Sequence, residues 1–225
     1  MTYVVSDIHG CDRKYAAMLD KLNFNNDDTL YILGDVVDRG SGGLHILLDA
    51  AARPNVILLR GNHEQAALEF LPYTPDSEIH SGALRERWRE WMQDGGERTY
   101  RAFRSSSAAT RVRILRILGS LPVYAETQVG ERRFFLAHTV PEKRKMRHPE
   151  NCRVRDFLTG EPEYEACYDP SRHIVTGHTI TSFIDVTSQG RIWHGNGHIA
   201  IDCGACYGGP LGCLCLDTME EVYVE

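Results

Sequence analysis

The feature that most constrains the fold is a polar heptapeptide, Gly34 to Gly40, that directly follows the apolar run Leu30-Tyr31-Ile32-Leu33. Asp35 is the first polar side chain after this run, and nothing in the run could neutralise a carboxylate carried inward. A buried carboxylate needs a partner, and a cation is the expected one. Because open α/β sheets place their chemistry at such strand ends, the heptapeptide predicts a metal beside an anion-binding site.

Two further residues of the heptapeptide are charged. Asp38 lies three residues after Asp35, and Arg39 offers a planar guanidinium that binds a phosphate or carboxylate through two hydrogen bonds. The alternative is a simple turn, in which Asp38 caps a helix and Gly40 supplies a left-handed residue. Two more strand ends with polar clusters disfavour this alternative.

The same pattern precedes and follows the heptapeptide. The apolar strand 3–6 ends in Asp7-Ile8-His9-Gly10, and the apolar run 56–59 ends in Arg60-Gly61-Asn62-His63-Glu64. In an extended backbone Asp7 and His9 would point to the same side, as two ligands of one ion require. Apolar residues at helical spacing follow the first two clusters. Three such units within about 65 residues predict a βαβαβ half-sheet with its polar clusters at one edge.

This edge would gather carboxylates, imidazoles, an amide and a guanidinium from three separate turns. Three unrelated turns would rarely place these groups together, so a metal centre is the simplest explanation. The residues expected there are Asp7, His9, Asp35, Asp38, Arg39, Asn62 and His63.

Residues 72 to 120 change in character from strands to helices. Leu84, Trp88 and Trp91 recur at helical spacing, and apolar residues continue after a serine-rich turn at residues 105–107. We predict a helical insertion in a single domain that spans residues 1–225. Its many arginines alternate with glutamates and apolar positions, which is typical of a solvated helix face.

Strands resume after the insertion. Residues 123–129 and 133–137 form a predicted hairpin that ends in His138, and the runs 174–176 and 199–201 precede His178 and Asp202. A single histidine after a strand is more often a core or surface residue than a ligand. Beside the polar groups already gathered, however, His138 and His178 are the natural remaining nitrogen ligands. The later strands predict a second sheet packed on the first.

Composition excludes several classes of function. The net charge is −6 and no basic block occurs, so binding along a nucleic-acid backbone is not expected. No apolar run approaches the length of a membrane span. The first strand begins next to Met1, without room for a signal peptide, and we therefore expect a cytoplasmic protein.

The cysteines do not predict a disulfide framework, because the 225 residues contain seven of them, an odd number, spread along the chain. Cys203-x-x-Cys206 with Cys213-x-Cys215 superficially resembles a zinc site, but the second spacing is wrong for one. Residues 213–216 instead predict a strand whose small thiols face inward.

Five motifs in this order resemble the calcineurin-like metallophosphoesterases, and within them the small bacterial and phage serine/threonine protein phosphatases and the symmetrical diadenosine tetraphosphatases. The resemblance runs nearly end to end and includes the segment Trp91-x-x-x-Gly95-Gly96-x-x-Thr99. It implies an α/β (α+β) fold in which a β-sandwich of two sheets is flanked by helices. The motifs are Asp7-x-His9, Gly34-Asp35-x-x-Asp38-Arg39-Gly40, Gly61-Asn62-His63-Glu64, His138 and Gly177-His178-Thr179.

The resemblance also implies a role for each motif residue. One divalent metal ion would be bound by Asp7, His9 and Asp35, and a second by Asp35, Asn62, His138 and His178, with Asp35 bridging the two. Manganese is the expected ion, with iron, zinc or magnesium as alternatives, because such mixed ligands accept each of them. His63, kept protonated by Asp38, would be the general acid. Arg39 and Arg155 would bind the substrate phosphate, although Arg153 stands where the family usually has an aromatic residue.

The leading prediction is a phosphomonoesterase that hydrolyses phosphoserine and phosphothreonine in proteins by direct attack of metal-bound hydroxide. The alternative substrate is diadenosine tetraphosphate or a related dinucleoside polyphosphate, for which Trp88, Trp91 or Tyr207 could supply a platform for the base. A catalytically silent scaffold is disfavoured because the ligand set is intact. The partner would be a phosphoprotein or a phosphorylated small molecule. The oligomeric state stays open, and a monomer is compatible with the sequence.

Overall fold

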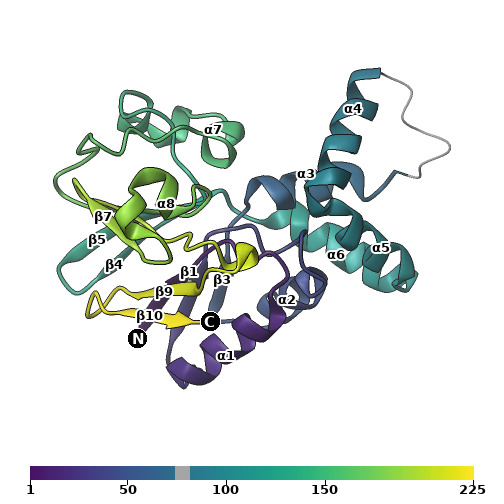
Figure 1. Cartoon of the computed structure of the whole chain (residues 1–225), viewed down its shortest axis with the longest axis horizontal. Coiled ribbons are helices and arrows are strands. Elements are labelled where there is room, and N and C mark those ends of the chain that lie inside the picture. The colour runs from purple at the N-terminus through teal and green to yellow at the C-terminus, as the bar shows by residue number, and fades with distance from the viewer. Residues whose placement is uncertain (74–81) are drawn as a thin grey trace.

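A computed structural model describes residues 1–73 and 82–225 of the chain. Two five-stranded mixed sheets face each other, with helices on their outer sides (Figure 1). The first sheet has the order β10-β9-β1-β2-β3 and the second the order β4-β5-β6-β8-β7. The α/β sandwich predicted from the sequence is therefore confirmed.

The first sheet contains the three N-terminal strands, β1 (Thr2–Val5), β2 (Thr29–Ile32) and β3 (Val56–Leu58), which are parallel. Two C-terminal strands, β9 (Leu211–Cys215) and β10 (Glu221–Val224), extend it in antiparallel pairing. Cys213 and Cys215 are buried in β9, as the strand prediction required.

The second sheet begins with the hairpin of β4 (Tyr124–Val129) and β5 (Arg132–Ala137). Strands β6 (His173–Thr176) and β8 (His198–Ala200) continue it parallel to β5, and β7 (Trp193–Gly195) closes the edge. Each sheet therefore contains three parallel neighbours whose carboxyl ends open on one side.

Apolar side chains fill the space between the sheets. Val4, Leu33 and Leu59 of the first sheet pack with Phe134 and Val175 of the second, and all are buried. Alternate residues of the same strands point to the opposite face and pack on helices α1 (Asp12–Leu22) and α2 (Gly43–Ala50). Strands that pack apolar side chains on both faces explain the continuous apolar runs in the sequence.

The predicted helical segment consists of α4 (Gly82–Trp91), the π-helical turn η1 (Met92–Gly96), α5 (Glu97–Ser105) and α6 (Ala108–Ser120). It lies beside α3 (Asn62–Phe70), with α4 directed away from the sheets (Figure 1). Its apolar side shares the core of the first sheet. Exposed pairs such as Arg101–Glu97 and Arg87–Glu69 agree with a solvated arginine face. Residues 74–81 of the predicted insertion lie outside the described residues.

Short helices and turns lie in the loops of the second half of the chain. They are α7 (Val154–Leu158), α8 (Thr181–Ile184) and the 3₁₀ turns η2 (Lys145–Arg147), η3 (Pro149–Asn151), η4 (Val186–Ser188) and η5 (Ala205–Tyr207). Among the described residues, none of the helices is both long and apolar enough to cross a lipid bilayer.

His198 of β8 is a buried histidine of the second sheet. Its Nε2 lies 2.8 Å from the Thr176 hydroxyl, and its ring stacks on Tyr164. Its Nδ1 has no hydrogen-bond partner among the described residues. Burial lowers the pKa of His198 to about 4, so the folded protein keeps this ring neutral.

We predict that His198 destabilises the protein in acid. The unfolded chain protonates this ring below about pH 6.5 and the folded chain only near pH 4, so the free energy of unfolding falls across that window. Between pH 7.5 and 4.5, His198→Gln should lose about 2 kcal/mol less stability than the wild type in urea unfolding. The exposed His148→Gln should follow the wild-type profile. If the free energy of unfolding fell equally with pH in His198→Gln and in the wild type, the neutral state assigned to His198 would be contradicted.

Candidate active site

The parallel strands of both sheets deliver polar side chains to one shared edge. In the first sheet Asp7 and Asp35 follow β1 and β2, and in the second sheet His138 and His178 follow β5 and β6. Two hydrogen bonds join the sheets here. His138 Nδ1 donates to the Leu33 carbonyl at 2.9 Å, and the His178 backbone N–H donates to Asp7 Oδ2 at 2.9 Å.

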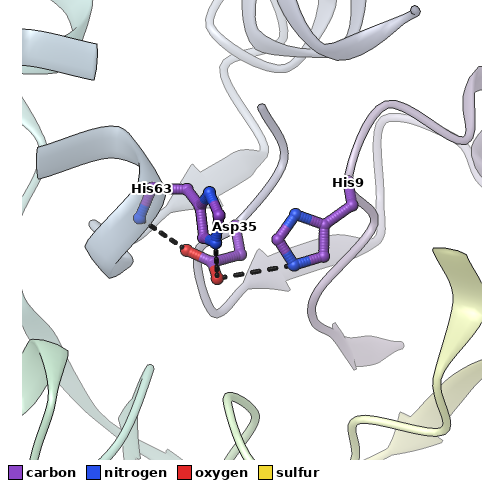
Figure 2. Close-up of side chains that lie close together, drawn as sticks. All are labelled: His9, Asp35 and His63. Atoms are coloured by element: carbon purple, nitrogen blue, oxygen red, sulfur yellow. Dashed lines mark hydrogen bonds and ion pairs between the residues drawn. The ribbon is translucent and has the colours of Figure 1, made fainter. Parts of the chain in front are cut away.

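Asp35 is the centre of the cluster. Its Oδ2 lies 3.5 Å from Nε2 of both His9 and His138, and 3.8 Å from His63 Nε2. Its Oδ1 accepts a hydrogen bond from the His63 backbone N–H at 3.1 Å (Figure 2). One carboxylate thereby faces nitrogen atoms from three different loops.

A second set of donor atoms adjoins Asp35. His138 Nε2 lies 2.8 Å from Asn62 Oδ1 and 3.0 Å from His178 Nδ1. His178 Nδ1 lies 3.2 Å from the same amide oxygen. Asp35 therefore belongs to two groups of closely spaced ligand atoms, and it is the residue expected to bridge two ions. The groups are His9–Asp35–His63 and Asp35–His138–His178.

The tautomers of two histidines follow from their partners. His9 Nδ1 lies 3.1 Å from the Val37 carbonyl and His138 Nδ1 bonds the Leu33 carbonyl. A carbonyl only accepts, so each Nδ1 carries the proton and each Nε2 presents a lone pair to Asp35. Burial lowers the pKa of His9 to about 2 and that of His138 and His178 to about 3. All three rings are neutral, as metal ligands must be.

His63 differs from these three histidines. Its Nδ1 lies 2.7 Å from Asp38 Oδ2, and its Nε2 lies 3.4 Å from Asp94 Oδ2. Burial opposes protonation, but the charge of Asp35 and the hydrogen bond to Asp38 outweigh it and raise the pKa of His63 to about 9. His63 is therefore a cation at neutral pH, which suits a proton donor rather than a metal ligand.

The helical segment holds Asp38 in place. Trp91 Nε1 donates to Asp38 Oδ2 at 2.7 Å, and Thr99 Oγ1 accepts from the Asp38 backbone N–H at 2.9 Å. Gly96 is required behind the indole, since a Cβ there would overlap the Trp91 ring. Trp91 and Thr99, the first and last residues of the segment quoted above, therefore orient Asp38. The Asp38 carboxylate in turn orients His63.

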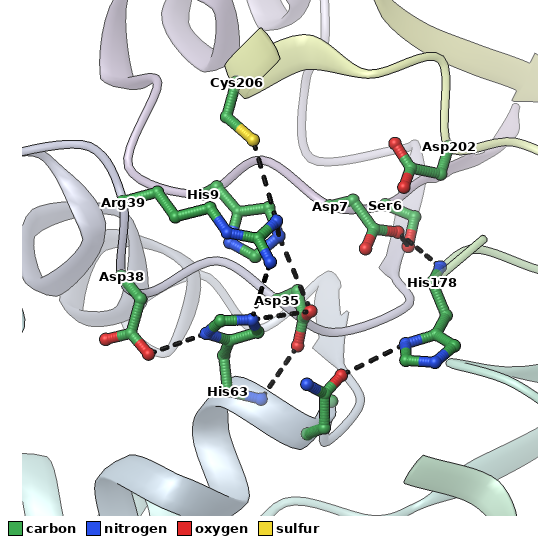
Figure 3. Close-up of polar contacts among 12 residues, drawn as sticks. Ser6, Asp7, His9, Asp35, Asp38, Arg39, His63, His178, Asp202 and Cys206 are labelled. Carbon is green, nitrogen blue, oxygen red and sulfur yellow. Dashed lines mark hydrogen bonds and ion pairs between the residues drawn. The ribbon is translucent and has the colours of Figure 1, made fainter. Parts of the chain in front are cut away.

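Arg39 lies across the cluster (Figure 3). Its Nη1 donates to His9 Nε2 at 2.7 Å, and its Nη2 lies 3.1 Å from Asp94 Oδ1 and 3.2 Å from His63 Nε2. On its other side the guanidinium lies 5.1 Å from the centre of the Tyr207 ring. This half-buried cation sits where an anion bound at the cluster would meet it.

The backbone of the site is unusual. Among the described residues, nine residues other than glycine have a positive φ, and six of these nine lie in the site. The six are Asp7, His9, Asp35, Asp38, Arg39 and His178. The expectation that Asp7 and His9 share a side because the backbone is extended is therefore wrong. Both residues are left-handed, with φ of 52° and 45°. Such conformations cost about 1–3 kcal/mol each and persist where surrounding contacts impose them.

Asp7 lies next to the cluster, but its atoms belong to neither group of closely spaced ligand atoms. Its Oδ2 accepts hydrogen bonds from the Ser6 hydroxyl and the His178 backbone N–H. Burial raises the pKa of Asp7 to about 6, and these two donors oppose the shift. A Cβ at Gly177 would overlap Asp7 Oδ2, so this position requires glycine.

Glu64 is a site residue that the sequence analysis quoted without assigning it a role. It is completely buried, and its Oε2 accepts from the backbone N–H groups of Asp35 at 2.7 Å and Gly61 at 2.9 Å. Its Oε1 accepts from Val36 at 2.9 Å and Val37 at 3.2 Å. One carboxylate therefore fixes the loops after β2 and β3, but a single glutamate in a sequence carries no sign of such contacts.

The donor set fits divalent metal ions. Buried carboxylates outnumber the two cations, Arg39 and His63, that the structure places among them. Burial raises the pKa of Asp35 well above its ordinary value, and that of Asp202 likewise, because their negative charge is poorly compensated. Carboxylate and amide oxygens with neutral imidazoles are the ligands that manganese, iron and zinc accept.

Arg155 is not joined to this cluster by any contact among the described residues. It is exposed on α7 and borders a surface hollow together with Glu142 and Lys145. Its role in binding phosphate stays a prediction.

Comparisons with known proteins agree with this geometry. The family model described as "Calcineurin-like phosphoesterase" matches residues 2–182. A symmetrical bis(5'-nucleosyl)-tetraphosphatase from Wigglesworthia glossinidia brevipalpis is 41% identical over 64 residues, which are 28% of this chain and 24% of the relative. A protein of the same name from Erwinia tasmaniensis is 40% identical over 95 residues, which are 41% of this chain and 31% of the relative. These matches span less than a third of the curated relatives.

Solved structures share the fold at low sequence identity. A putative diadenosine tetraphosphatase is 16% identical with a TM-score of 0.65, and the match covers 99% of this chain and 92% of that one. A protein serine/threonine phosphatase from Saccharomyces cerevisiae, similar to human phosphatase PP5, is 16% identical with a TM-score of 0.56, covering 94% and 71%.

We predict that Glu64→Gln destabilises the loops of the site. The amide NH₂ would face backbone N–H donors where the carboxylate accepts them, which leaves buried donors unpaired. The free energy of unfolding should fall by about 2–4 kcal/mol. Urea unfolding measures this loss, and elemental analysis should show reduced metal binding. Glu69→Gln, on the same helix, pairs with the exposed Arg87 and should change stability by about 0.5 kcal/mol or less. Equal effects of the two substitutions would argue against the role given to Glu64.

Proposed function

The chain belongs to the calcineurin-like phosphoesterase family, and from this premise we propose that it is a metal-dependent hydrolase of phosphate esters and anhydrides. The observation that carries the proposal is Asp35, shared between two groups of ligand atoms and flanked by the His63–Asp38 pair and Arg39. The proposed ligands are Asp7, His9 and Asp35 for one ion, and Asp35, Asn62, His138 and His178 for the other. Manganese is the ion we expect.

Two divalent ions, when bound, supply activation of water and Lewis-acid stabilisation of charge on the phosphoryl group. The chain supplies the rest. The planar guanidinium of Arg39 binds phosphoryl oxygens through paired hydrogen bonds and holds the phosphorus in place. Strand ends from two sheets fix the ligands, so little reorganisation is needed during the reaction.

His63 is the proposed general acid. Its Nδ1 proton is held by Asp38, which leaves the Nε2 proton free to pass to the leaving-group oxygen. A cavity of about 250 Å³ lies on this side, bordered by Asn62, His63 and Trp91. We propose that the leaving group occupies this cavity, since His63 Nε2 must come within hydrogen-bond distance of it.

The first candidate substrate is a dinucleoside tetraphosphate. The names of the curated relatives support it, and the two compared above are 41% and 40% identical over the matched segments. A phosphoprotein, which the sequence analysis favoured, is the second candidate. Protonated His63 supports it, because a serine alkoxide needs a proton to leave, whereas a nucleoside diphosphate departs as a stable anion.

The two substrates are separable by initial rates on metal-stripped protein reconstituted with manganese. We expect diadenosine tetraphosphate to be cleaved to two molecules of adenosine diphosphate, and more rapidly than phosphoserine or phosphotyrosine peptides. Chelation of the metal should abolish turnover. Faster cleavage of the phosphoserine peptide would reverse the ranking. Absence of turnover on all three, and on p-nitrophenyl phosphate, would reject the hydrolase proposal and favour a silent scaffold.

We predict that His63→Asn lowers kcat according to the leaving group. Loss of a general acid typically costs about 10²–10⁴-fold, and the cost falls as the leaving group becomes a weaker base. An alkyl phosphate should therefore lose far more than p-nitrophenyl phosphate, with the metal content unchanged. The exposed His148→Asn is the matched control and should retain wild-type rates. An equal loss on both substrates would exclude proton donation by His63.

A further inference from the structure

A second, larger cavity lies on the opposite side of Arg39 from His63 and Asp94. Its volume is about 820 Å³, and it lies between α8 and the loop that contains the turn η5. Phe183 and Ile180 border it on one side, and Cys203, Tyr207 and Pro210 border it on the other. Every side chain that lines this cavity is uncharged, in contrast to the ionised cluster beside it.

Two aromatic rings of this cavity are unusually exposed. The exposed fraction is 80% for Phe183 and 64% for Tyr207, although such rings are normally covered. Single exposed apolar residues are common, but two rings that border one cavity indicate a binding surface. These rings would be buried by a flat, uncharged ligand that stacks on them.

The structure distinguishes among the three aromatic residues considered as a platform for a base. Trp91 is buried and donates its N–H to Asp38, so it has a structural role. Trp88 packs against Tyr100 within the helical segment. Tyr207 borders the cavity and is exposed.

The cavity adjoins the proposed phosphate site through Tyr207, which lines the cavity and contacts Arg39. The Arg39 guanidinium lies 5.1 Å from the Tyr207 ring and 2.7 Å from His9 Nε2. Cys206, next to Tyr207 in η5, also contacts Arg39 through its sulfur at 3.8 Å (Figure 3). A ligand stacked on Tyr207 would therefore lie next to the residue proposed to bind phosphoryl oxygens.

We propose that this cavity binds the purine base of a nucleoside phosphate, stacked on Tyr207 and Phe183, while Arg39 binds the adjoining phosphate. The proposal rests on the proposed hydrolase function and names the part of the substrate that its site recognises. The neutral lining favours an uncharged base over the charged side chains that surround many phosphorylated serines. The amide of Gln189 and the hydroxyl of Ser182, which also line the cavity, can bond the polar edge of the base.

Phe183→Ala is the primary test, because Phe183 is exposed and its removal leaves the core intact. On the manganese-reconstituted full chain, stacking predicts a rise in KM for diadenosine tetraphosphate of about tenfold. The rate on glycerol 2-phosphate, which has no base, should stay unchanged. Tyr207→Phe should behave like the wild type, and Tyr207→Ala should raise KM for diadenosine tetraphosphate as Phe183→Ala does. Val186→Ala is the matched control, since Val186 is equally exposed but does not line the cavity.

A binding measurement on the metal-stripped full chain makes the test independent of turnover. Titration calorimetry should give tighter binding of adenosine diphosphate than of pyrophosphate, and Phe183→Ala should remove this difference. If this holds although the wild type cleaves no dinucleotide, the base site stands and the proposed substrate fails. Equal affinity for the two ligands in the wild type, or an unchanged preference in Phe183→Ala, would overturn the base site even in an active hydrolase.

Discussion

The structure depends on how it accommodates carboxylates in its interior. Asp7, Asp35, Asp38, Glu64 and Asp202 are all buried, and an unpaired buried charge is strongly destabilising. Glu64 is satisfied by four backbone N–H groups. Asp38 is paired through Oδ2 alone, with His63 and Trp91, and its Oδ1 has no hydrogen-bond partner among the described residues. Asp35 has one backbone donor and otherwise faces imidazole nitrogens. The charge of Asp35 is therefore poorly compensated at the place where divalent ions would bind, and the fully paired Glu64 fixes the loops around it.

Two sheets are needed to complete such a centre. Each sheet has three parallel strands, and parallel strands end at a common edge, so each sheet supplies part of the proposed ligand set. The apolar layer between them sets their relative position, and the bond from His138 to the Leu33 carbonyl fixes the ring of one sheet on the backbone of the other. Packing of this kind also holds the positive φ angles at Asp35 and His178, which no local sequence preference would maintain.

Arg39 lies between two structurally different regions, the helical segment and the uncharged cavity beside Tyr207. On one side Asp94 and the helical segment meet His63, and on the other side Tyr207 leads into an uncharged cavity. The helical segment orients Asp38 through Trp91 and Thr99. The loop that contains η5 contributes Tyr207 to the proposed base site.

The sequence by itself determined the strands that carry the site and the residue types at their ends. Buried parallel strands give continuous apolar runs, and the first polar residue after each run, such as Asp35 or His138, must lie at the sheet edge. The three-residue β7 and the C-terminal β10 were not predicted, because their short runs take their pairing from neighbouring strands. Tertiary structure alone decided the left-handed backbone at Asp7 and His9, the role of Glu64, and which aromatic residue stays exposed. All three features depend on contacts between residues far apart in the chain, and such contacts cannot be predicted from local periodicity.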